Sequence, residues 1–532
     1  MAGNLIERYP SKPDEIDWAS RRIALSRPAL HTILTALGMA AIFAAFLSVV
    51  QYSTPNLAGV DGYYHIRFAS IMRIQGLKPA FPWLPLTILN PREYYDHHFL
   101  FHVALIPFTF GDLRLGAKLA SVLFPTLAFL SIWWLLRGQR VPYSALWALG
   151  LLAISEAFIY RMSLVRAQSL SLAVLVIGLH WMLNKKYARL LPLGFIYVWL
   201  YDAFPLLFAL ATLYVLSILL IEHRLELRPL VFAGLGIALG LIINPYFPNS
   251  VVFVFRHLAP KLTETTAVDV GSEWYPYNTS QLLENSSLAL VAFFAGVLAL
   301  GMQERRMETR TATSLLVAVL FGLMLFQSRR FIEYFPPFAL IFAAFAWRPV
   351  LEGSDTRDSV GERHRPIIQI IQKIWPGATL SQAINVVVLL AFLLPGTWIT
   401  LRASQASLRT SSPYTLFAGA SRWLQENTPA GSRVFQTDWD DFPHLFFYNT
   451  HNTYLVGLDP TFMQLYSADL YSLWVKITRG DVERPSQYIY DRFGSRYVVS
   501  DLNHTAFIAQ AKKDPGLHEV YRDNEAIIFA LK

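Results

Sequence analysis

The chain has no cysteine and few charged residues. Of its 532 residues, 0 are Cys and only 15% are Asp, Glu, Lys or Arg, whereas a soluble domain carries about 25% charged residues. The absence of cysteine excludes disulfides and thiolate metal sites. The shortage of charge, together with a 54% share of hydrophobic residues, indicates that lipid surrounds much of the chain. There is also no internal repeat and no low-complexity tract.

Long apolar runs follow one another along the chain. The spanning candidates are His31–Val50, Leu115–Leu136, Tyr143–Ala157, Ser169–Leu183, Leu190–Leu200, Leu206–Ile221, Pro229–Ile243, Leu288–Met302, Ala312–Phe326, Phe331–Trp347 and Ile384–Leu401, with Phe99–Phe110 as a weaker one. There are thus about eleven candidates. A bilayer-spanning helix needs about 20 residues, so the several shorter runs must thin the bilayer or form re-entrant segments. The first run follows a polar segment, and we expect it to remain in the protein as a membrane helix rather than to be cleaved off as part of a signal peptide.

Basic residues predict the orientation of these spans. With the N-terminus inside, Lys and Arg gather in the inner loops, as in cytoplasmic loops generally. The formal charge of +8 is thus typical of a membrane protein and does not favour nucleic acid. The sequence predicts a cytoplasmic segment 1–28, a transmembrane domain 29–401 with a long outer loop 51–102, and an extracytoplasmic domain 402–532.

The last domain has the pattern of an α/β fold. Helices are expected at Tyr414–Asn427 and Thr505–Lys513, and strands at Arg433–Gln436 and Arg496–Ser500. A hairpin is expected where Asp523-Asn524 separates the strands Glu519–Arg522 and Ala526–Leu531. The predicted fold class is therefore mainly α: a polytopic helical transmembrane domain followed by an extracytoplasmic α/β domain.

Acidic, aromatic and histidine residues occur together twice in the first outer loop. The two stretches are Val60-Asp61-Gly62-Tyr63-Tyr64-His65-Ile66-Arg67 and Glu93-Tyr94-Tyr95-Asp96-His97-His98-Phe99-Leu100-Phe101-His102. Ionisable residues at a membrane are functional candidates by default. Carboxylates with imidazoles suit Mg²⁺, Mn²⁺ or Zn²⁺, so Asp61, Asp96, His97 and His98 are candidate metal ligands. The alternative is an interfacial loop with ordinary solvated charges.

Fixed cations recur at the predicted outer face. Arg161 and Arg166 stand at the end of one span, and Arg329 and Arg330 open another. Arginine binds phosphate in a bidentate manner, so these residues are candidates for holding a phosphate or pyrophosphate. The alternative is that they anchor the helices at the lipid headgroups. Asp202 in the neighbouring loop is either functional or the buried partner of an arginine.

The C-terminal domain contributes an acidic and aromatic turn, Thr437-Asp438-Trp439-Asp440-Asp441, directly after a predicted strand. Such a turn can present a binding loop, while one of its aspartates can also cap the helix that follows.

Together these features resemble the GT-C glycosyltransferases, and among them the catalytic subunit of oligosaccharyltransferase. Asp61 lies in a stretch similar to the family's first-loop acidic motif, and Glu273 lies where the family places a glutamate in a late outer loop. Arg329 or Arg330 resembles an arginine that contacts the donor. Thr437-Asp438-Trp439-Asp440 is similar to the Trp-Trp-Asp acceptor motif, which implies that Trp439 and Asp440 bind the acceptor.

Two departures from that family stand out. The acidic pair of the second outer loop, which binds metal in the family, is replaced by Val165-Arg166-Ala167-Gln168-Ser169. In addition, Asp438 stands where the first Trp of the acceptor motif would be. A cation at Arg166 could replace the metal in neutralising phosphate, or Asp96, His97 and His98 could supply the missing ligands for Mn²⁺ or Mg²⁺.

The resemblance implies an integral membrane glycosyltransferase. It would move a sugar or oligosaccharide from a polyprenyl-phosphate-linked donor to a protein or glycan acceptor, with Asp61 and Glu273 as the catalytic acids and Arg166, Arg329 and Arg330 at the donor phosphate. Two rival functions are an inactive relative that binds a lipid-linked glycan and a lipid or solute transporter. A transporter would more naturally show inverted repeats.

The orientation can be tested with reporters. A topology reporter fused after Lys532 should lie outside the cytoplasm, and one inserted within Glu352–Lys373 should lie inside, because the basic loops remain cytoplasmic. Accessibility labelling of both fusions in intact cells measures this. Finding the two reporters on the same side would overturn the membrane map.

Overall fold

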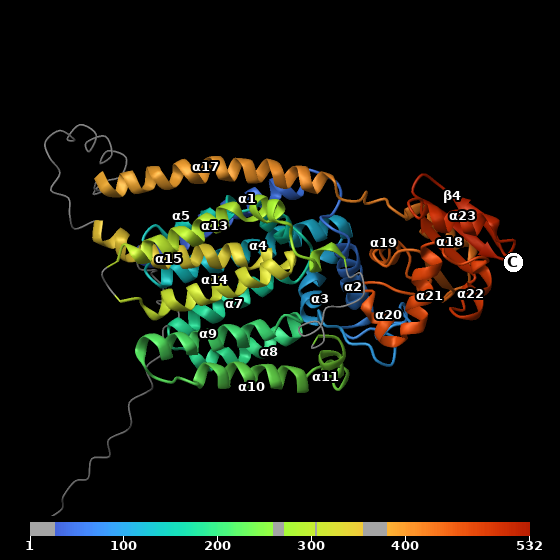
Figure 1. Ribbon diagram of the computed structural model, residues 1–532, viewed down its shortest axis with the longest axis horizontal. Coiled ribbons are helices and arrows are strands. Elements are labelled where there is room, and N and C mark those ends of the chain that lie inside the picture. Colours follow the sequence, from blue (N-terminus) through green and yellow to red (C-terminus); the bar gives the residue numbers. More distant parts are fainter. Residues whose placement is uncertain (1–26, 259–270, 304–305, 355–379) are drawn as a thin grey trace, which may run out of the picture.

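The computed structural model describes residues 27–258, 271–303, 306–354 and 380–532. Most of the predicted cytoplasmic segment 1–28 and most of the inner loop Glu352–Lys373 lie outside these residues. Figure 1 shows two bodies: helices that run side by side along the long axis, and a smaller C-terminal domain at one end of them.

The helical body begins at Arg27 and ends at Arg409. Its α-helices are α1 (Arg27–Gln51), α2 (Asp61–Gln75), α3 (Phe99–Leu105), α4 (Leu113–Gly138), α5 (Ser144–Leu149), α6 (Glu156–Met162), α7 (Gln168–Leu183), α8 (Leu190–Leu200), α9 (Pro205–Glu222), α10 (Arg228–Ile242), α11 (Asn249–Phe253), α13 (Thr279–Gly301), α14 (Thr309–Gln327), α15 (Phe335–Ser354) and α17 (Leu380–Arg409).

The long apolar helices indicate a multi-pass membrane protein. Within the described residues, six helices are long and apolar enough to cross a membrane, or up to seven if the bent pair Ser144–Leu152 and Glu156–Met162 is one span. The six match the predicted runs that begin at His31, Leu115, Leu206, Leu288, Ala312 and Ile384. The bent pair, which turns by 86°, takes in the run Tyr143–Ala157.

The remaining predicted runs form shorter or more buried helices. Apolar helices cover Gln168–Leu183, Tyr187–Leu200 and Arg228–Ile242, each below the length of a full span. Phe331–Trp347 overlaps α15, whose residues from Phe338 to Ala346 are all buried. The weak candidate Phe99–Phe110 forms α3 and the 3₁₀ turn η1 (Ile106–Thr109).

The C-terminal domain is a small mixed sheet covered by short helices. Its elements are α18 (Ala418–Asn427), β1 (Arg433–Gln436), α19 (Phe442–Tyr448), β2 (Thr453–Tyr454), α20 (Thr461–Tyr466), α21 (Ala468–Thr478), α22 (Pro485–Asp491), β3 (Tyr497–Asp501), α23 (Thr505–Lys513), β4 (Leu517–Arg522) and β5 (Ala526–Leu531). The strand order is β2-β1-β3-β5-β4. Strand β1 is parallel to β2 and β3, whereas β5 is antiparallel to β3 and β4.

The loop between α1 and α2 is fixed by one buried lysine on α4. The ammonium of Lys118, which is 1% exposed, donates to the carbonyls of Gln51, Thr54 and Asn56 at 2.6, 2.8 and 2.7 Å. Hydrogen bonds from a charged donor are stronger than neutral ones. The loop therefore delivers the start of α2 to a defined place.

The segment after α2 joins the two bodies. The Trp83 indole N–H donates to the Thr450 carbonyl at 2.9 Å, the Tyr454 amide donates to the Trp83 carbonyl at 2.8 Å, and the Ile88 amide donates to the Phe462 carbonyl at 3.1 Å. Tyr63 on α2 stacks on His444 of α19, with ring centroids 4.1 Å apart. The C-terminal domain is thus attached directly to α2, which begins with Asp61, and to the segment that follows it.

Candidate functional site

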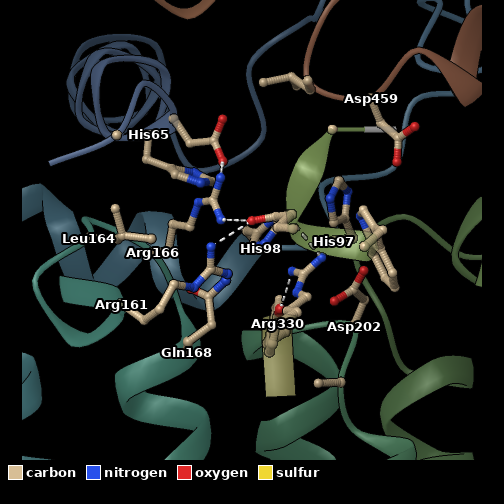
Figure 2. A pocket seen from close by; sticks show the side chains of 18 of the residues that line it. His65, His97, His98, Arg161, Leu164, Arg166, Gln168, Asp202, Arg330 and Asp459 are labelled. Carbon is tan, nitrogen blue, oxygen red and sulfur yellow. Dashed lines mark hydrogen bonds and ion pairs between the residues drawn. The ribbon is translucent and has the colours of Figure 1, made fainter. Parts of the chain in front are cut away.

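A pocket of about 560 Å³ opens where the helical body meets the C-terminal domain. One wall is the start of α2 and the turn between α6 and α7, and the opposite wall includes Tyr201, Asp202 and Arg330. Trp439, Asp440 and Asp459 line it from the C-terminal domain. Figure 2 shows arginine and histidine side chains from different elements pointing into this space.

Asp61 is the first residue of α2, and its carboxylate is paired with Arg166. The Arg166 guanidinium donates to Asp61 Oδ2. The approach is close because Gly62 follows Asp61: a Cβ there would lie 3.0 Å from Cβ of Val165, next to the arginine. A carboxylate at a helix N-terminus is also favoured by the helix dipole. The position where the resemblance implies a metal-binding acid thus holds a fixed cation that contacts Asp61.

Glu273 is the carboxylate on which three arginines converge. It lies in the 3₁₀ turn η5 (Ser272–Trp274). Its Oε2 accepts from Nη1 of Arg161 at 2.6 Å and from Nη1 of Arg166 at 2.9 Å, and its Oε1 lies 3.5 Å from Nη1 of Arg330. Burial raises the pKa of the Glu273 carboxyl, but the Arg166, Arg161 and Arg330 guanidiniums outweigh it and hold that pKa well below its ordinary value.

A second buried acid completes this network. Glu333, which is 0% exposed, accepts from Nε of Arg161 at 2.7 Å and also from its Nη2. The network therefore sets the guanidiniums of Arg161, Arg166 and Arg330 against the carboxylates of Asp61, Glu273 and Glu333. Within these six side chains the formal charges cancel, as charges removed from water require.

The two neighbouring arginines at 329 and 330 have different surroundings. Arg330, in the 3₁₀ turn η6 (Arg329–Glu333), lines the pocket, where its Nη2 donates to the Tyr201 hydroxyl at 2.6 Å and its guanidinium lies 4.8 Å from the Trp274 ring centroid. Arg329 donates to the Pro276 carbonyl at 3.2 Å and lines a separate pocket of about 300 Å³. Of the pair, Arg330 is the one that can meet a ligand beside Glu273.

The four side chains considered as metal ligands are not grouped around one point. Asp61 is held by Arg166, and Asp96 lies outside the pocket lining, where its carboxylate accepts from His102 Nδ1 at 2.8 Å. His97 and His98 line the pocket. Across the part of the chain that the structure describes, no group of three or more His, Asp or Glu could hold a metal ion. The described side chains therefore do not form a ready-made ligand set for Mn²⁺ or Mg²⁺.

The acceptor-motif residues Trp439 and Asp440 line the pocket beyond the carboxyl end of one strand. Both follow β1, and next to it Asp501 ends β3. Thr437 donates its hydroxyl to that of Ser500 at 2.9 Å, which closes the gap between the two strands. Burial, with the nearby Asp438 and the more distant Asp61 and Asp501, raises the pKa of Asp440 to about 7. His504 donates to Asp501 at 2.5 Å, and this bond raises the pKa of the imidazole.

The pocket brings together most of the residues singled out from the sequence. Asp61, Arg166, Glu273, Arg330, His97, His98, Trp439 and Asp440 all line it, while Asp96 and Arg329 do not. Arg161, one of the arginines considered for a phosphate, also lines the pocket, whereas Glu333 was not singled out from the sequence. Their signal is present in the sequence: each is an ionisable residue beside an apolar run, and in a membrane protein such residues require partners.

The overall fold matches solved membrane glycosyltransferases. No protein-family model and no curated protein matches this chain. Archaeal oligosaccharyltransferase AglB from Archaeoglobus fulgidus, in complex with an inhibitory peptide and a dolichol-phosphate, has a TM-score of 0.63 at 15% identity, covering 93% of this chain and 74% of that one. The comparison therefore concerns the fold.

Two further structures give the same result. ArnT from Cupriavidus metallidurans bound to undecaprenyl phosphate has a TM-score of 0.54 at 18% identity, covering 94% of this chain and 98% of that one. Arabinofuranosyltransferase AftD from Mycobacteria has a TM-score of 0.53 at 14% identity, covering 92% of this chain and 40% of that one. The chain thus has the fold of the GT-C glycosyltransferases, as the sequence predicts.

The raised pKa of Asp440 predicts a pH-dependent cost to stability. The folded protein keeps a proton on Asp440 up to about pH 7, whereas the unfolded chain releases it near pH 4. The stability that this proton supplies is therefore lost as pH rises through about 7. Asp440→Asn should therefore gain stability relative to the wild type between pH 5 and pH 8.5, by about 1 kcal/mol or more, since one pKa unit is about 1.4 kcal/mol. Thermal denaturation in detergent at the two pH values measures it.

The exposed Asp481 provides the matched control. Asp481→Asn should differ from the wild type by the same amount at both pH values. An equal effect of Asp440→Asn on stability at pH 5 and pH 8.5 would contradict a raised pKa for the Asp440 carboxyl.

Proposed function

We propose that this chain is a membrane glycosyltransferase that uses a polyprenyl-phosphate-linked sugar donor. The observation on which the proposal rests is the convergence of Arg161, Arg166 and Arg330 on Glu273, beside Asp61, in a pocket of about 560 Å³ between the two bodies of a GT-C fold. With the predicted orientation, that pocket opens on the extracytoplasmic face. The acceptor, a protein or a glycan, enters from the water.

The donor phosphate is recognised by guanidiniums. Arginine presents five N–H donors in a fork that matches phosphate oxygens. Arg330 and Arg166 each have one contact with Glu273, and a donor phosphate competes with that carboxylate for the same N–H groups. Leu206, Met324 and Phe331 also line the pocket and offer apolar surface to the first isoprene units. This division of the pocket suits a ligand with an anionic head and an apolar tail.

The chemistry is substitution at the anomeric carbon of the sugar. The bond from that carbon to the phosphate oxygen breaks, and the electron pair leaves with the lipid phosphate. Fixed cations are most effective where negative charge develops in the transition state, and the phosphate oxygen beside Arg330 and Arg166 is such a place. Asp61 positions the acceptor group or receives its proton, while Trp439 and Asp440 hold the acceptor on the opposite side.

The solved structures support this assignment by analogy. ArnT was solved with undecaprenyl phosphate, and AglB with a dolichol-phosphate and an inhibitory peptide. For the present chain, the guanidiniums of Arg166 and Arg330 neutralise the lipid phosphate in place of a divalent cation, because Arg166 already forms an ion pair with the Asp61 carboxylate. This arrangement favours a transferase that works without a metal.

Metal independence is a direct prediction. Turnover of a panel of radiolabelled polyprenyl-phosphate and polyprenyl-diphosphate sugars should persist in excess EDTA, because the charge of the leaving phosphate is met by arginine. Arg166→Gln should lower turnover by at least about 10²-fold, the typical effect of removing one donor to developing charge. Loss of wild-type turnover in EDTA and its recovery with Mn²⁺ or Mg²⁺ would instead establish a metal site.

The Asp61 carboxylate is the residue that the reaction can least spare. Asp61→Asn keeps the shape of the side chain but removes the partner of Arg166, so turnover should fall by about 10²–10⁴-fold. Binding of undecaprenyl phosphate should be retained or tightened, because Arg166 is released to the ligand. Glu273→Gln should show the same pattern with a similar or smaller loss of turnover. Single-turnover assays and lipid-phosphate binding separate the two effects.

Asp112 is the matched control, since it is an aspartate at the start of α4 that accepts from the Leu115 amide at 2.9 Å and lies outside the pocket. Asparagine caps helices as well as aspartate does, so Asp112→Asn should be silent. Wild-type turnover by folded Asp61→Asn would move the site elsewhere. A wild-type protein that binds lipid phosphate but turns over none of the donors would be a binding relative of the transferases.

A further inference from the structure

Three buried side chains form a hydrogen-bonded chain that starts at the pocket wall. His65 lines the pocket, and its Nδ1 lies 2.8 Å from Nε2 of His102. Nδ1 of His102 lies 2.8 Å from Oδ2 of Asp96. The three residues are 4%, 0% and 3% exposed. These hydrogen bonds therefore connect the pocket to a buried carboxylate without interruption.

The surrounding elements hold each ring in place. His65 is one helical turn after Asp61 on α2, so both side chains are presented to the same pocket. His102 belongs to α3, and Asp96 is fixed before that helix because its Oδ1 accepts from the His98 amide at 3.0 Å. The His65 ring packs against Phe101 at 5.2 Å, and the His102 ring packs against Phe68 at 4.9 Å.

The carboxylate at the end of the chain determines where the protons are. A carboxylate at Asp96 accepts in this contact, so His102 donates from Nδ1. In this tautomer, the Nε2 lone pair of His102 accepts from Nδ1–H of His65. With Nδ1 protonated, neutral His65 has its lone pair on Nε2. Burial, His102, Arg166 and His97 together lower the pKa of His65 well below its ordinary value, which favours this neutral form.

We propose that Asp96 and His102 fix His65 as a proton acceptor with Nε2 available to the pocket, and that during glycosyl transfer His65 takes the proton of the acceptor group and passes its own Nδ1 proton to His102. The inference rests on the proposed function and adds a residue to it. It distinguishes His65 from Asp61, whose carboxylate is already engaged by the Arg166 guanidinium.

The proposed proton path balances. The acceptor oxygen forms a bond to the anomeric carbon, and the bond from that carbon to the phosphate oxygen breaks. The acceptor proton goes to Nε2 of His65, the Nδ1 proton of His65 passes to Nε2 of His102, and His102 becomes an imidazolium beside Asp96. The positive charge therefore ends on His102, next to the Asp96 carboxylate. If it remained on His65, the Arg166 guanidinium would repel it.

The charged and titratable groups around His65 come from several elements. Its own helix contributes Asp61, and α3 contributes His102. His97 and His98 lie just before α3, the latter with its ring centroid 5.0 Å away, and the turn before α7 contributes Arg166. Asp96, which precedes His97, bonds Nδ1 of His102, so its replacement tests the proposed direction of the hydrogen bonds.

Solid-state ¹⁵N NMR of histidine-labelled protein in lipid tests the tautomers without any donor. In the wild type, His65 and His102 should both be protonated on Nδ1 only, with resonances assigned by the single variants His65→Gln and His102→Gln. In Asp96→Asn the amide can donate to Nδ1 of His102, which should move the proton of both rings to Nε2. Protonation of wild-type His65 on Nε2 alone would overturn the proposal.

Turnover measurements test whether this proton path from His65 to His102, the relay, operates during glycosyl transfer. His65→Gln and Asp96→Asn should each lower kcat by about 10²–10⁴-fold while binding of undecaprenyl phosphate stays within about 3-fold of the wild type. His180→Gln is the matched control, a buried histidine on α7 that contacts Asn184 and Trp134 outside the pocket, and it should keep the wild-type kcat.

The outcomes separate the two proposals. Wild-type kcat in folded His65→Gln would overturn the relay while the transferase function stands. If the wild type turns over none of the donors, the proposed function fails, and the NMR tautomers still decide whether His65 is a fixed proton acceptor.

Discussion

The pocket depends on the balance between three guanidiniums and three carboxylates withdrawn from water. A buried ion that loses its partner costs several kcal/mol, so the six side chains cannot be treated separately: Arg161, Arg166, Arg330, Asp61, Glu273 and Glu333. Arg161 joins both glutamates, and Arg166 joins Glu273 to Asp61. This network connects the start of α2, the turn before α7 and the two 3₁₀ turns, and it thereby sets the shape of the space that a ligand enters.

Much of the fold could be predicted because membrane helices are defined by composition. Nine of the eleven apolar runs each coincide with one helix, while Tyr143–Ala157 crosses the bent pair and Phe331–Trp347 begins in η6 and continues in α15. In the C-terminal domain β1, β5 and α23 have the predicted bounds. The bend between α5 and α6 could not be foreseen, because no proline or glycine stands at Ala153-Ile154-Ser155 and hydropathy does not report direction. Strand β2 was missed for a different reason: its two residues are too short to show a period.

The site was predicted in its parts but not in its pairings. Acidic and basic residues at the predicted outer face were correctly expected to gather, since lipid excludes isolated charge. That Arg166 pairs with Asp61 rather than standing apart from it depends on the closeness of Gly62 to Val165, which only the three-dimensional arrangement reveals. Similarly, the distance from His65 to His102 comes from the packing of α2 on α3, and the spacing of the two histidines in the sequence gives no sign of it.

The attachment of the C-terminal domain also has a consequence for how this protein can be divided. Trp83 exchanges backbone and indole hydrogen bonds with Thr450 and Tyr454, and Tyr63 stacks on His444. Removing the domain would leave these aromatic rings against water and their polar groups without partners. Although the chain has two bodies in shape, these contacts couple the stability of one body to the other, so a different C-terminal domain would require a redesigned first loop.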